Sequence, residues 1–221
     1  MDSAKNTARI TGLIGLIVLI TGSFAYTVNS KLIVPGDAIT TAENLIENES
    51  LFRLGIVSGL FMEIIFMFYA FLLYSLLRQV NKNYATMMII IAIIPVPLFL
   101  LNQLNLFATL LLAEDGMLNQ ILFFLELYKY GGLVVSIFFG LWLLPLGYLV
   151  YKSGYLPKII GIVLMIGCFG YLISFFQGFL FPGKEKTLWT NPFLVVTHIS
   201  EILLMFWLLI KGVNEDRFKN T

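Results

Sequence analysis

The sequence predicts an all-α membrane protein with six transmembrane helices and both termini in the cytoplasm. Three observations predict it: the composition, six long apolar runs, and the distribution of basic residues between them. Of the 221 residues, 59% are hydrophobic and only 12% are charged, whereas a soluble domain carries roughly 25% charged residues. So few charges cannot cover a water-facing surface, and lipid must therefore be the solvent for much of the chain.

Six apolar runs reach or approach the roughly 20 residues that a helix needs to cross the hydrocarbon core. Each run is apolar all round, which is typical of a helix that faces lipid and other helices. The connections are short, so consecutive helices should be antiparallel neighbours in a single transmembrane domain covering residues 1–221. The predicted spans are residues 10–28, 54–77, 85–113, 131–151, 159–180 and 193–210.

Basic residues predict the orientation. Nine of them flank the spans on the side of the two termini, against three in the loops of the other side. Because cytoplasmic loops are enriched in Lys and Arg, we expect both termini in the cytoplasm and the protein in the plasma (inner) membrane. The nine are Lys5, Arg9, Arg78, Lys82, Lys152, Lys158, Lys211, Arg217 and Lys219, and the three are Lys31, Lys184 and Lys186.

The first span fits two interpretations. Lys5 and Arg9, an apolar run and Ser23-Phe24-Ala25 resemble a cleavable signal peptide. An internal repeat instead favours a retained helix, because residues 9–36 and 158–183 share a basic start, a Phe-small-Tyr triplet and a closing Pro-Gly.

The repeat extends into the spans that follow. Glu63-Ile-Ile-Phe-Met-Phe aligns with Glu201-Ile-Leu-Leu-Met-Phe. The simplest interpretation is three helical hairpins in the same orientation, a parallel repeat. The first span would then be a structural partner of the second.

Polar side chains within the spans gather in the outer half of the predicted bundle. An ionisable group at membrane depth costs roughly 2.5–3.5 kcal/mol, so such groups usually face the bundle interior and mark a site. We therefore predict a polar cavity, open or gated toward the outside. Its candidate ligand-binding residues are Arg53, Glu63, Asn102, Asn105, Glu126, Lys129, His198 and Glu201.

The alternative is that these residues bond to one another and only hold the helices together. Arg53 would then pair with Glu126, or Lys129 with Glu49. Glycines precede Glu63 at a spacing of four residues, and they favour close helix packing on the face that carries the carboxyl.

His198 and Glu201 stand three residues apart and share a helical face. With Glu63 they could form an acid–base or metal-ligand set in an intramembrane hydrolase. One histidine and two distant carboxylates are a weak zinc pattern. No metal or other cofactor is therefore predicted, and no catalytic residue is identified.

Two local features complete the predicted elements. Pro95 and Pro97 remove backbone donors and should kink or break the third span. Residues 37–49 should form a short amphipathic helix in an outer loop, either as a lid over the bundle or resting on the outer interface. Its predicted apolar side consists of Ala38, Ile39, Ala42, Leu45 and Ile46.

The leading functional hypothesis is a non-enzymatic protein that binds a lipid-like or small solute, or moves a solute or proton, at this polar layer. Membrane lipids and a small amphiphilic ligand are the expected partners. A net charge of +1 argues against nucleic acid, which requires a concentrated basic face. The intramembrane enzyme and a structural or regulatory subunit are the alternatives, and the oligomeric state is left open.

Seven segments along the chain carry a family resemblance: Arg9-Ile-Thr-Gly-Leu, Leu32-Ile-Val-Pro-Gly-Asp37, Leu51-Phe-Arg-Leu-Gly-Ile-Val57, Leu72-Leu-Tyr-Ser-Leu-Leu-Arg78, Phe124-Leu-Glu-Leu127, Gly147-Tyr-Leu-Val-Tyr-Lys-Ser-Gly-Tyr-Leu-Pro157 and Leu208-Leu-Ile-Lys-Gly212. The chain resembles the bacterial multipass membrane proteins called domain of unknown function 4386. The resemblance covers nearly the whole chain and implies a small membrane protein without an established activity or catalytic residue. Members of that family often carry a histidine where this chain has Tyr128, which argues against a metal site at this position.

Overall fold

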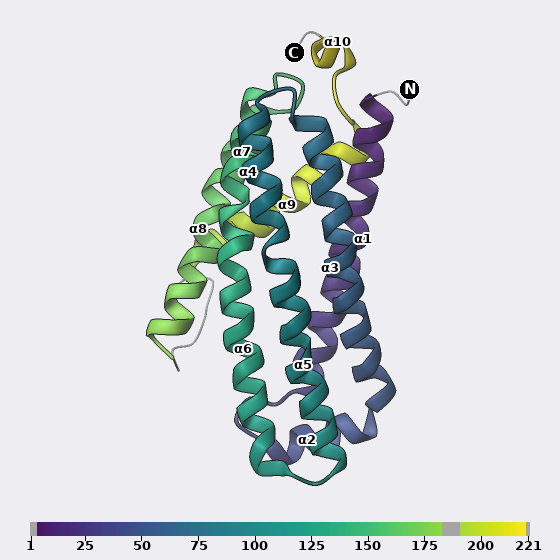
Figure 1. The fold of residues 1–221 in the computed structure, drawn as a ribbon, viewed down its shortest axis with the longest axis vertical. Coiled ribbons are helices and arrows are strands. Elements are labelled where there is room, and N and C mark those ends of the chain that lie inside the picture. The colour runs from purple at the N-terminus through teal and green to yellow at the C-terminus, as the bar shows by residue number, and fades with distance from the viewer. Residues whose placement is uncertain (1–3, 183–190, 220–221) are drawn as a thin grey trace. The chain divides into compact units, whose positions relative to one another are not determined.

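The computed structural model describes residues 4–182 and 191–219, and every regular element in these ranges is a helix. Figure 1 shows the helices in chain order. They are α1 (Ala4–Leu32), α2 (Ala38–Glu47), α3 (Glu49–Leu77), α4 (Lys82–Ile93), α5 (Pro95–Glu114), α6 (Leu118–Leu141), α7 (Leu143–Lys152), α8 (Lys158–Leu180), α9 (Pro192–Ile210) and α10 (Glu215–Lys219).

Six helical stretches are long and apolar enough to cross a membrane, which confirms the predicted six-helix membrane protein. They are α1, α3, α4 with α5, α6 with α7, α8, and α9. Gly183, Lys184 and Lys186, on which the predicted repeat and orientation partly rest, lie outside the described residues.

Two of the six stretches are interrupted near a proline. α4 ends at Ile93 and α5 begins at Pro95, so the predicted break is confirmed. Proline has no N–H to donate to the preceding turn and its ring crowds that turn. The break between α6 and α7 was not predicted, although Pro145 gives it the same cause, since it cannot donate to the Leu141 carbonyl.

The chain folds into two compact units, and four helical stretches contribute to both. Unit 1 consists of Met1–Leu16, Phe66–Pro95 and Leu133–Thr221, and unit 2 of Ile17–Ile65 and Val96–Gly132.

In unit 1, glycines allow close packing of helix backbones. α7 contacts both α4 and α8. A Cβ on Gly161 of α8 would lie only 2.6 Å from the Gly147 carbonyl oxygen of α7. α8 and α9 also approach closely, because the Thr197 hydroxyl donates to the Gly167 carbonyl.

Tyr155 fixes the turn between α7 and α8. Gly154 takes the left-handed conformation, with φ at 71°, that glycine adopts most readily. The Tyr155 hydroxyl donates to the Leu76 carbonyl oxygen of α3 at 2.6 Å, and its ring packs edge-on against Phe218 of α10 at 5.0 Å. Burial raises the pKa of this hydroxyl above its ordinary value. The segment with the most specific family resemblance therefore ties α3 and α10 to the turn.

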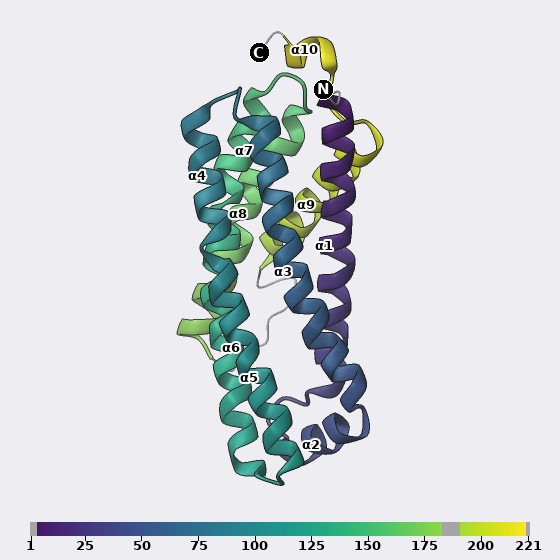
Figure 2. The same cartoon turned by 45° about the vertical axis from the view of Figure 1, so that its right-hand side comes forward.

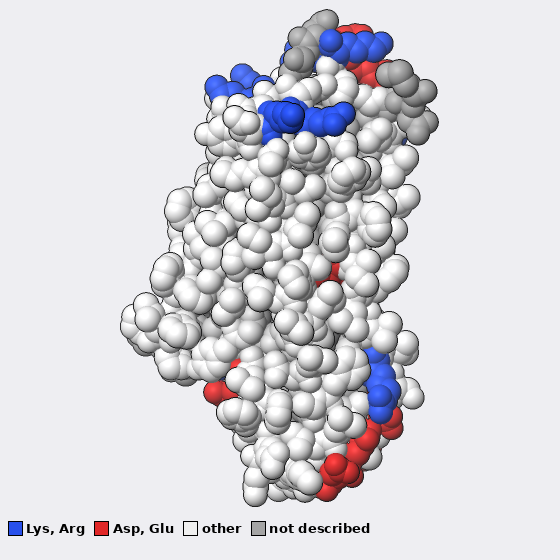
Figure 3. All heavy atoms as spheres, in the orientation of Figure 1, with Lys and Arg blue, Asp and Glu red and all other residues white. Residues whose placement is uncertain are grey.

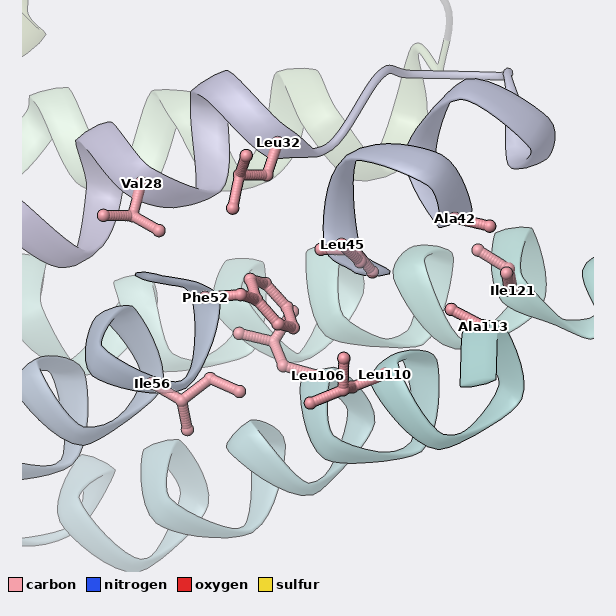
Figure 4. Close-up of a cluster of buried hydrophobic side chains, with 10 residues drawn as sticks. All are labelled: Val28, Leu32, Ala42, Leu45, Phe52, Ile56, Leu106, Leu110, Ala113 and Ile121. Atoms are coloured by element: carbon pink, nitrogen blue, oxygen red, sulfur yellow. The ribbon is translucent and has the colours of Figure 1, made fainter. Parts of the chain in front are cut away.

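In unit 2, an apolar cluster joins α2 to four longer helices (Figure 4). α2 lies across one end of these helices (Figure 2). Fully burying a side chain of the size of Leu45 or Phe52 contributes roughly 1.5–3 kcal/mol, so α2 is firmly docked. The cluster consists of Val28, Leu32, Ala42, Leu45, Phe52, Ile56, Leu106, Leu110, Ala113 and Ile121.

Hydrogen bonds at its first turn also stabilise α2. Asp37 is the N-cap, and its carboxylate accepts from the Thr40 backbone N–H at 3.0 Å and from the Thr40 hydroxyl at 2.7 Å. These bonds hold the pKa of the Asp37 carboxyl below its ordinary value. Asn44 donates to the Leu32 carbonyl at 3.2 Å and so satisfies an acceptor at the end of α1.

The predicted apolar side of α2 is wrong for two residues. Ile39 and Ile46 are 60% and 52% exposed, because the side of α2 that packs on the other helices of unit 2 passes through Thr41, Ala42 and Leu45 instead. The Thr41 hydroxyl donates to the Val34 carbonyl, and this bond draws a polar residue into the buried side.

Charged side chains are unevenly divided between the units. Unit 2 carries eight acidic and three basic side chains, whereas the nine basic residues predicted to be cytoplasmic all belong to unit 1. On the face shown in Figure 3, Lys and Arg of unit 1 gather where α4 begins and α10 lies, and the sides of its helices are almost entirely uncharged. Such a surface suits contact with lipid.

Candidate functional site

Unit 2 contains a cavity of about 930 Å³ between α1, α3, α5 and α6. Pockets of roughly 300–1,000 Å³ hold drug-sized ligands, so this volume suits a molecule of the size of a single-chain lipid. Its polar lining residues are Asn29, Ser30, Gln103, Glu126, Tyr128 and Lys129, and the others are Gly22, Ala25, Tyr26, Ile33, Pro35, Gly36, Gly59, Met62, Phe99, Leu122, Phe123 and Leu125.

Small residues on α1 and α3 make room for the cavity. A Cβ on Gly59 would lie 3.7 Å from the Ala25 Cβ and 3.8 Å from the Phe99 ring, which is ordinary contact. One turn away, a Cβ on Gly55 would lie 2.9 Å from Val28, so the two helices touch there. The predicted glycine spacing therefore serves packing at Gly55 and borders the cavity at Gly59.

The amide of Asn29 lies on the polar wall of the cavity. Its Nδ2 donates to the Tyr128 hydroxyl at 3.3 Å, and Gln103 also hydrogen bonds to this hydroxyl. The other polar atom, Asn29 Oδ1, is buried, and no described residue donates to it. Asn29 therefore contributes its Nδ2 bond to Tyr128 at this wall, while its Oδ1 is enclosed by the surrounding protein.

The mouth of the cavity opens between α1 and α6. Both helices present a large exposed ring there, Tyr26 at 76% on α1 and Phe123 at 62% on α6. Glu126 and Lys129 stand beside them on α6 as an exposed ion pair with 3.9 Å between Oε1 and Nζ. Gly59 and Gln103, which are buried, lie on the opposite side. The cavity thus has an apolar interior and a charged rim, and no residue of α2 lines it.

Asn102 and Asn105 bond within unit 2 and do not line the cavity. Asn102 Nδ2 donates to the Tyr128 carbonyl at 2.9 Å, and Asn105 Nδ2 donates to Asn102 Oδ1 at 3.0 Å. A Cβ on Gly131 would collide with the Asn102 carboxamide. These two amides therefore position the part of α6 that carries Tyr128.

Arg53 has different partners from those considered in the sequence. It pairs with Glu49, one turn earlier on α3, and with Glu114 at the end of α5 at 3.2 Å. The pairing with Glu126 is therefore wrong, as is that of Lys129 with Glu49, because Glu126 and Lys129 pair with each other on α6. Ion pairs this exposed contribute little to stability, because solvent screens the charges.

Glu63 is fully buried in unit 2. Neither carboxyl oxygen has a hydrogen-bond partner among the residues that the structure describes. Its neighbour Met62 lines the cavity, as does Gly59 one turn earlier, but Glu63 does not.

His198 and Glu201 belong to unit 1, whereas Glu63 belongs to unit 2. The Tyr171 hydroxyl donates to Glu201 Oε2 at 3.3 Å. His198 Nδ1 is 3.9 Å from the same oxygen, which is longer than a hydrogen bond. Over residues 4–182 and 191–219, no group of three or more His, Cys, Asp or Glu side chains could hold a metal ion.

Sequence reasoning missed four polar lining residues, namely Asn29, Ser30, Gln103 and Tyr128. The Asn29 amide was missed for a local reason. The first span was predicted to end at Val28, whereas α1 continues to Leu32, so the amide was assigned to a loop. Glu126 and Lys129 were placed at the head of the fourth span, but α6 begins at Leu118. In both places the helix extends beyond the predicted apolar run, after Val28 in α1 and before residue 131 in α6. The polar residues that flank each run were the available signal.

Comparison with known proteins identifies the family of this chain. An uncharacterized protein of Archaeoglobus fulgidus is 34% identical to this chain over 140 residues, which are 63% of this chain and 72% of that protein. No solved structure matches the chain. The sequence pattern of the family described as domain of unknown function (DUF4386) matches residues 10–212, and the chain therefore belongs to this family.

Proposed function

We propose that this protein binds a single-chain amphiphile in the cavity of unit 2, without chemical conversion of the ligand. The observation that carries the proposal is a cavity of about 930 Å³ whose walls are mostly apolar and whose polar groups are few. An apolar chain in this cavity makes van der Waals contacts with wall atoms that otherwise have no packing partner. The polar groups then orient one end of the ligand.

The mouth indicates how such a ligand reaches the cavity. Tyr26 and Phe123 present large exposed rings there, and Glu126 and Lys129 supply charge of both signs. An aromatic and charged rim of this kind suits the boundary between lipid chains and headgroups. The ligand therefore enters sideways from the membrane, between α1 and α6.

The topology that goes with this proposal has six spans in three parallel hairpins, with both termini in the cytoplasm of a plasma-membrane protein. The nine basic residues of unit 1 support it through the positive-inside rule. The loops of unit 2 contain few basic residues, which is consistent with loops on the extracytoplasmic side. In this topology, the outer leaflet supplies the ligand.

Filling the cavity from Gly59 tests the proposed binding. Gly59→Leu should lower the affinity for hexadecanol about tenfold or more, a loss of about 1.4 kcal/mol, because its side chain extends into the ligand's space. Native mass spectrometry of the full-length protein in detergent measures the bound molecules per chain and their affinity. Val57→Leu is the matched control, since Val57 lies on the exposed side of α3 and should bind as wild type does.

Two results would contradict the proposal. One is the absence of saturable binding by the wild-type protein. The other is equal affinity of folded Gly59→Leu and wild type, which would place the lipid on the outer surface of the helices.

A further inference from the structure

Two lysine side chains share one aromatic ring where α7 meets α8 in unit 1. α7 ends at Lys152 and α8 begins at Lys158. Their Nζ atoms lie 6.0 and 5.6 Å from the centroid of the Tyr151 ring. The two helices approach closely here, because a Cβ on Gly161 would lie 2.6 Å from the Tyr151 backbone nitrogen. The packing of α7 on α8 therefore holds two positive charges beside the same ring.

A third lysine lies at the same end of unit 1. α4 begins at Lys82, and Tyr84 in its first turn stacks on Tyr148 of α7 with 4.3 Å between the ring centroids. Tyr148 stands about one turn before Lys152, so the first turn of α4 lies beside the last turns of α7. Figure 3 shows basic side chains gathered where α4 begins. Lys82, Lys152 and Lys158 together form the lysine cluster.

No acidic side chain of these three helices balances the lysine cluster. Residues 66–95 and 133–182, which contain α4, α7 and α8, include no Asp or Glu. α10 carries Glu215 and Asp216, yet no carboxylate among the described residues forms an ion pair with any of the three lysines. Each lysine is exposed, and each ammonium offers up to three N–H donors. The lysine cluster therefore suits an anion with several acceptor oxygens.

An exposed apolar stripe runs along α8 directly after Lys158. Its residues stand three or four positions apart and so share one helical face. Such a face suits contact with lipid chains, while lysines near the end of a membrane helix extend to the headgroup layer. The stripe consists of Ile159, Ile162, Ile166 and Phe169.

We propose that unit 1 binds an anionic phospholipid at this place, with its phosphate at the lysine cluster and an acyl chain along the apolar stripe. A phosphate oxygen accepts charge-assisted hydrogen bonds from an ammonium group. Clusters of basic residues next to a membrane helix attract anionic headgroups for this reason. A phosphatidylcholine head also brings a cation, which the lysines repel. The proposed site is independent of the cavity in unit 2.

Native mass spectrometry of the full-length protein in a neutral detergent tests the assignment. Dioleoylphosphatidylglycerol and dioleoylphosphatidylcholine carry the same chains, but only the first has a net negative head. Wild type should bind the glycerol lipid about tenfold more tightly than the choline lipid. sn-Glycerol 3-phosphate, which has the phosphate without the chains, should not bind at the same concentrations.

Paired variants locate the preference on the molecule. Lys152→Gln, Lys158→Gln should bring the ratio of the two lipid affinities close to one, because the head then meets a single ammonium. Arg9→Gln, Lys211→Gln is the matched control. It removes the same amount of charge from two exposed positions of unit 1 outside α4, α7 and α8, and its ratio should equal that of wild type.

Four results would overturn the proposal. They are equal affinity of wild type for the two lipids, a full preference retained in folded Lys152→Gln, Lys158→Gln, and an equal loss of preference in the control variant, which would assign the effect to net charge alone. The fourth is binding of sn-glycerol 3-phosphate as tight as that of the lipid, which would make the lysine cluster a site for free phosphates. The wild-type measurements decide the matter even where the glutamine variant does not fold.

Discussion

At the scale of single residues, two adjacent glycines on α6 differ in what a side chain would meet. A Cβ on Gly131 would collide with the Asn102 carboxamide, whereas one on Gly132 would have no described atom within 4 Å. Gly131→Ala should lower the free energy of unfolding by about 1–3 kcal/mol, because the displaced amide loses its bonds to Tyr128 and Asn105. Gly132→Ala is the control and should change it by about 1 kcal/mol or less, in the stabilising direction.

The protein carries its own reporter for this measurement. Cys168 is the single cysteine of the chain and is buried in α8, so a thiol-reactive fluorophore reaches it as the protein unfolds on heating. The double variant Gly131→Ala, Asn102→Ala should lose no more stability than Asn102→Ala alone, since the colliding group is gone. If the double variant instead loses the sum of the two single losses, Asn102 is not the group that Gly131 accommodates.

The residues around this site show what a sequence can predict of a membrane interior. The cost of polar groups at membrane depth drew attention to Asn102, Asn105, Glu126 and Lys129 as candidates to line one cavity. Glu126 and Lys129 do line the described cavity, whereas Asn102 and Asn105 bond to α6 and to each other and do not line it. The partners could not be predicted, because spacing gives the depth of a residue on its helix but not which neighbour its side chain meets. Arg53 reaches Glu114 because α3 and α5 are neighbours in unit 2, a fact that neither residue's surrounding sequence contains.

At the scale of helices, the contact between α7 and α8 depends on Gly161. A Cβ there would lie 2.6 Å from both the Gly147 carbonyl oxygen and the Tyr151 backbone nitrogen. Neither backbone atom can move without separating the helices, so Gly161→Ala should cost about 1–3 kcal/mol of unfolding free energy. The same thiol-based thermal unfolding measures it, with Ile159→Ala on the exposed side of α8 as control. Equal thermal stability of the two variants would show that α7 and α8 can separate at little cost.

Helix boundaries were predictable only where composition marks them. Pro95 breaks the third span as expected, because proline acts locally through its missing N–H. Pro145 breaks the fourth span for the same reason, yet it lies in an unbroken apolar run that reads as one helix. α6 begins well before its apolar run because Glu126 and Lys129 can lie at its exposed surface beside the cavity mouth. Hydropathy identifies the residues that contact lipid, whereas the backbone hydrogen bonds determine where a helix begins and ends.

At the scale of the whole molecule, composition was sufficient to predict an all-α protein with six apolar helices, and membership of the DUF4386 family agrees with it. The division into two units was not predictable, since its limits fall inside α1, α3 and α6, where the sequence stays uniformly apolar. The division matters for function, because the described cavity lies entirely within unit 2. Which leaflet supplies a ligand therefore depends on which side of the membrane the loops of unit 2 face.

Single cysteines in two loops test that side. In a Cys168→Ala background, a membrane-impermeant maleimide applied to intact cells should label Asp115→Cys, in the loop between α5 and α6, and leave Asn83→Cys at the start of α4 unlabelled until the membrane is permeabilised. Both positions are exposed, so accessibility differs only through the membrane, and the nine basic residues of unit 1 set the expected direction. The reverse pattern would place the termini outside. The cavity would then take its ligand from the cytoplasmic leaflet, and the binding site would be unchanged while the direction of supply is inverted.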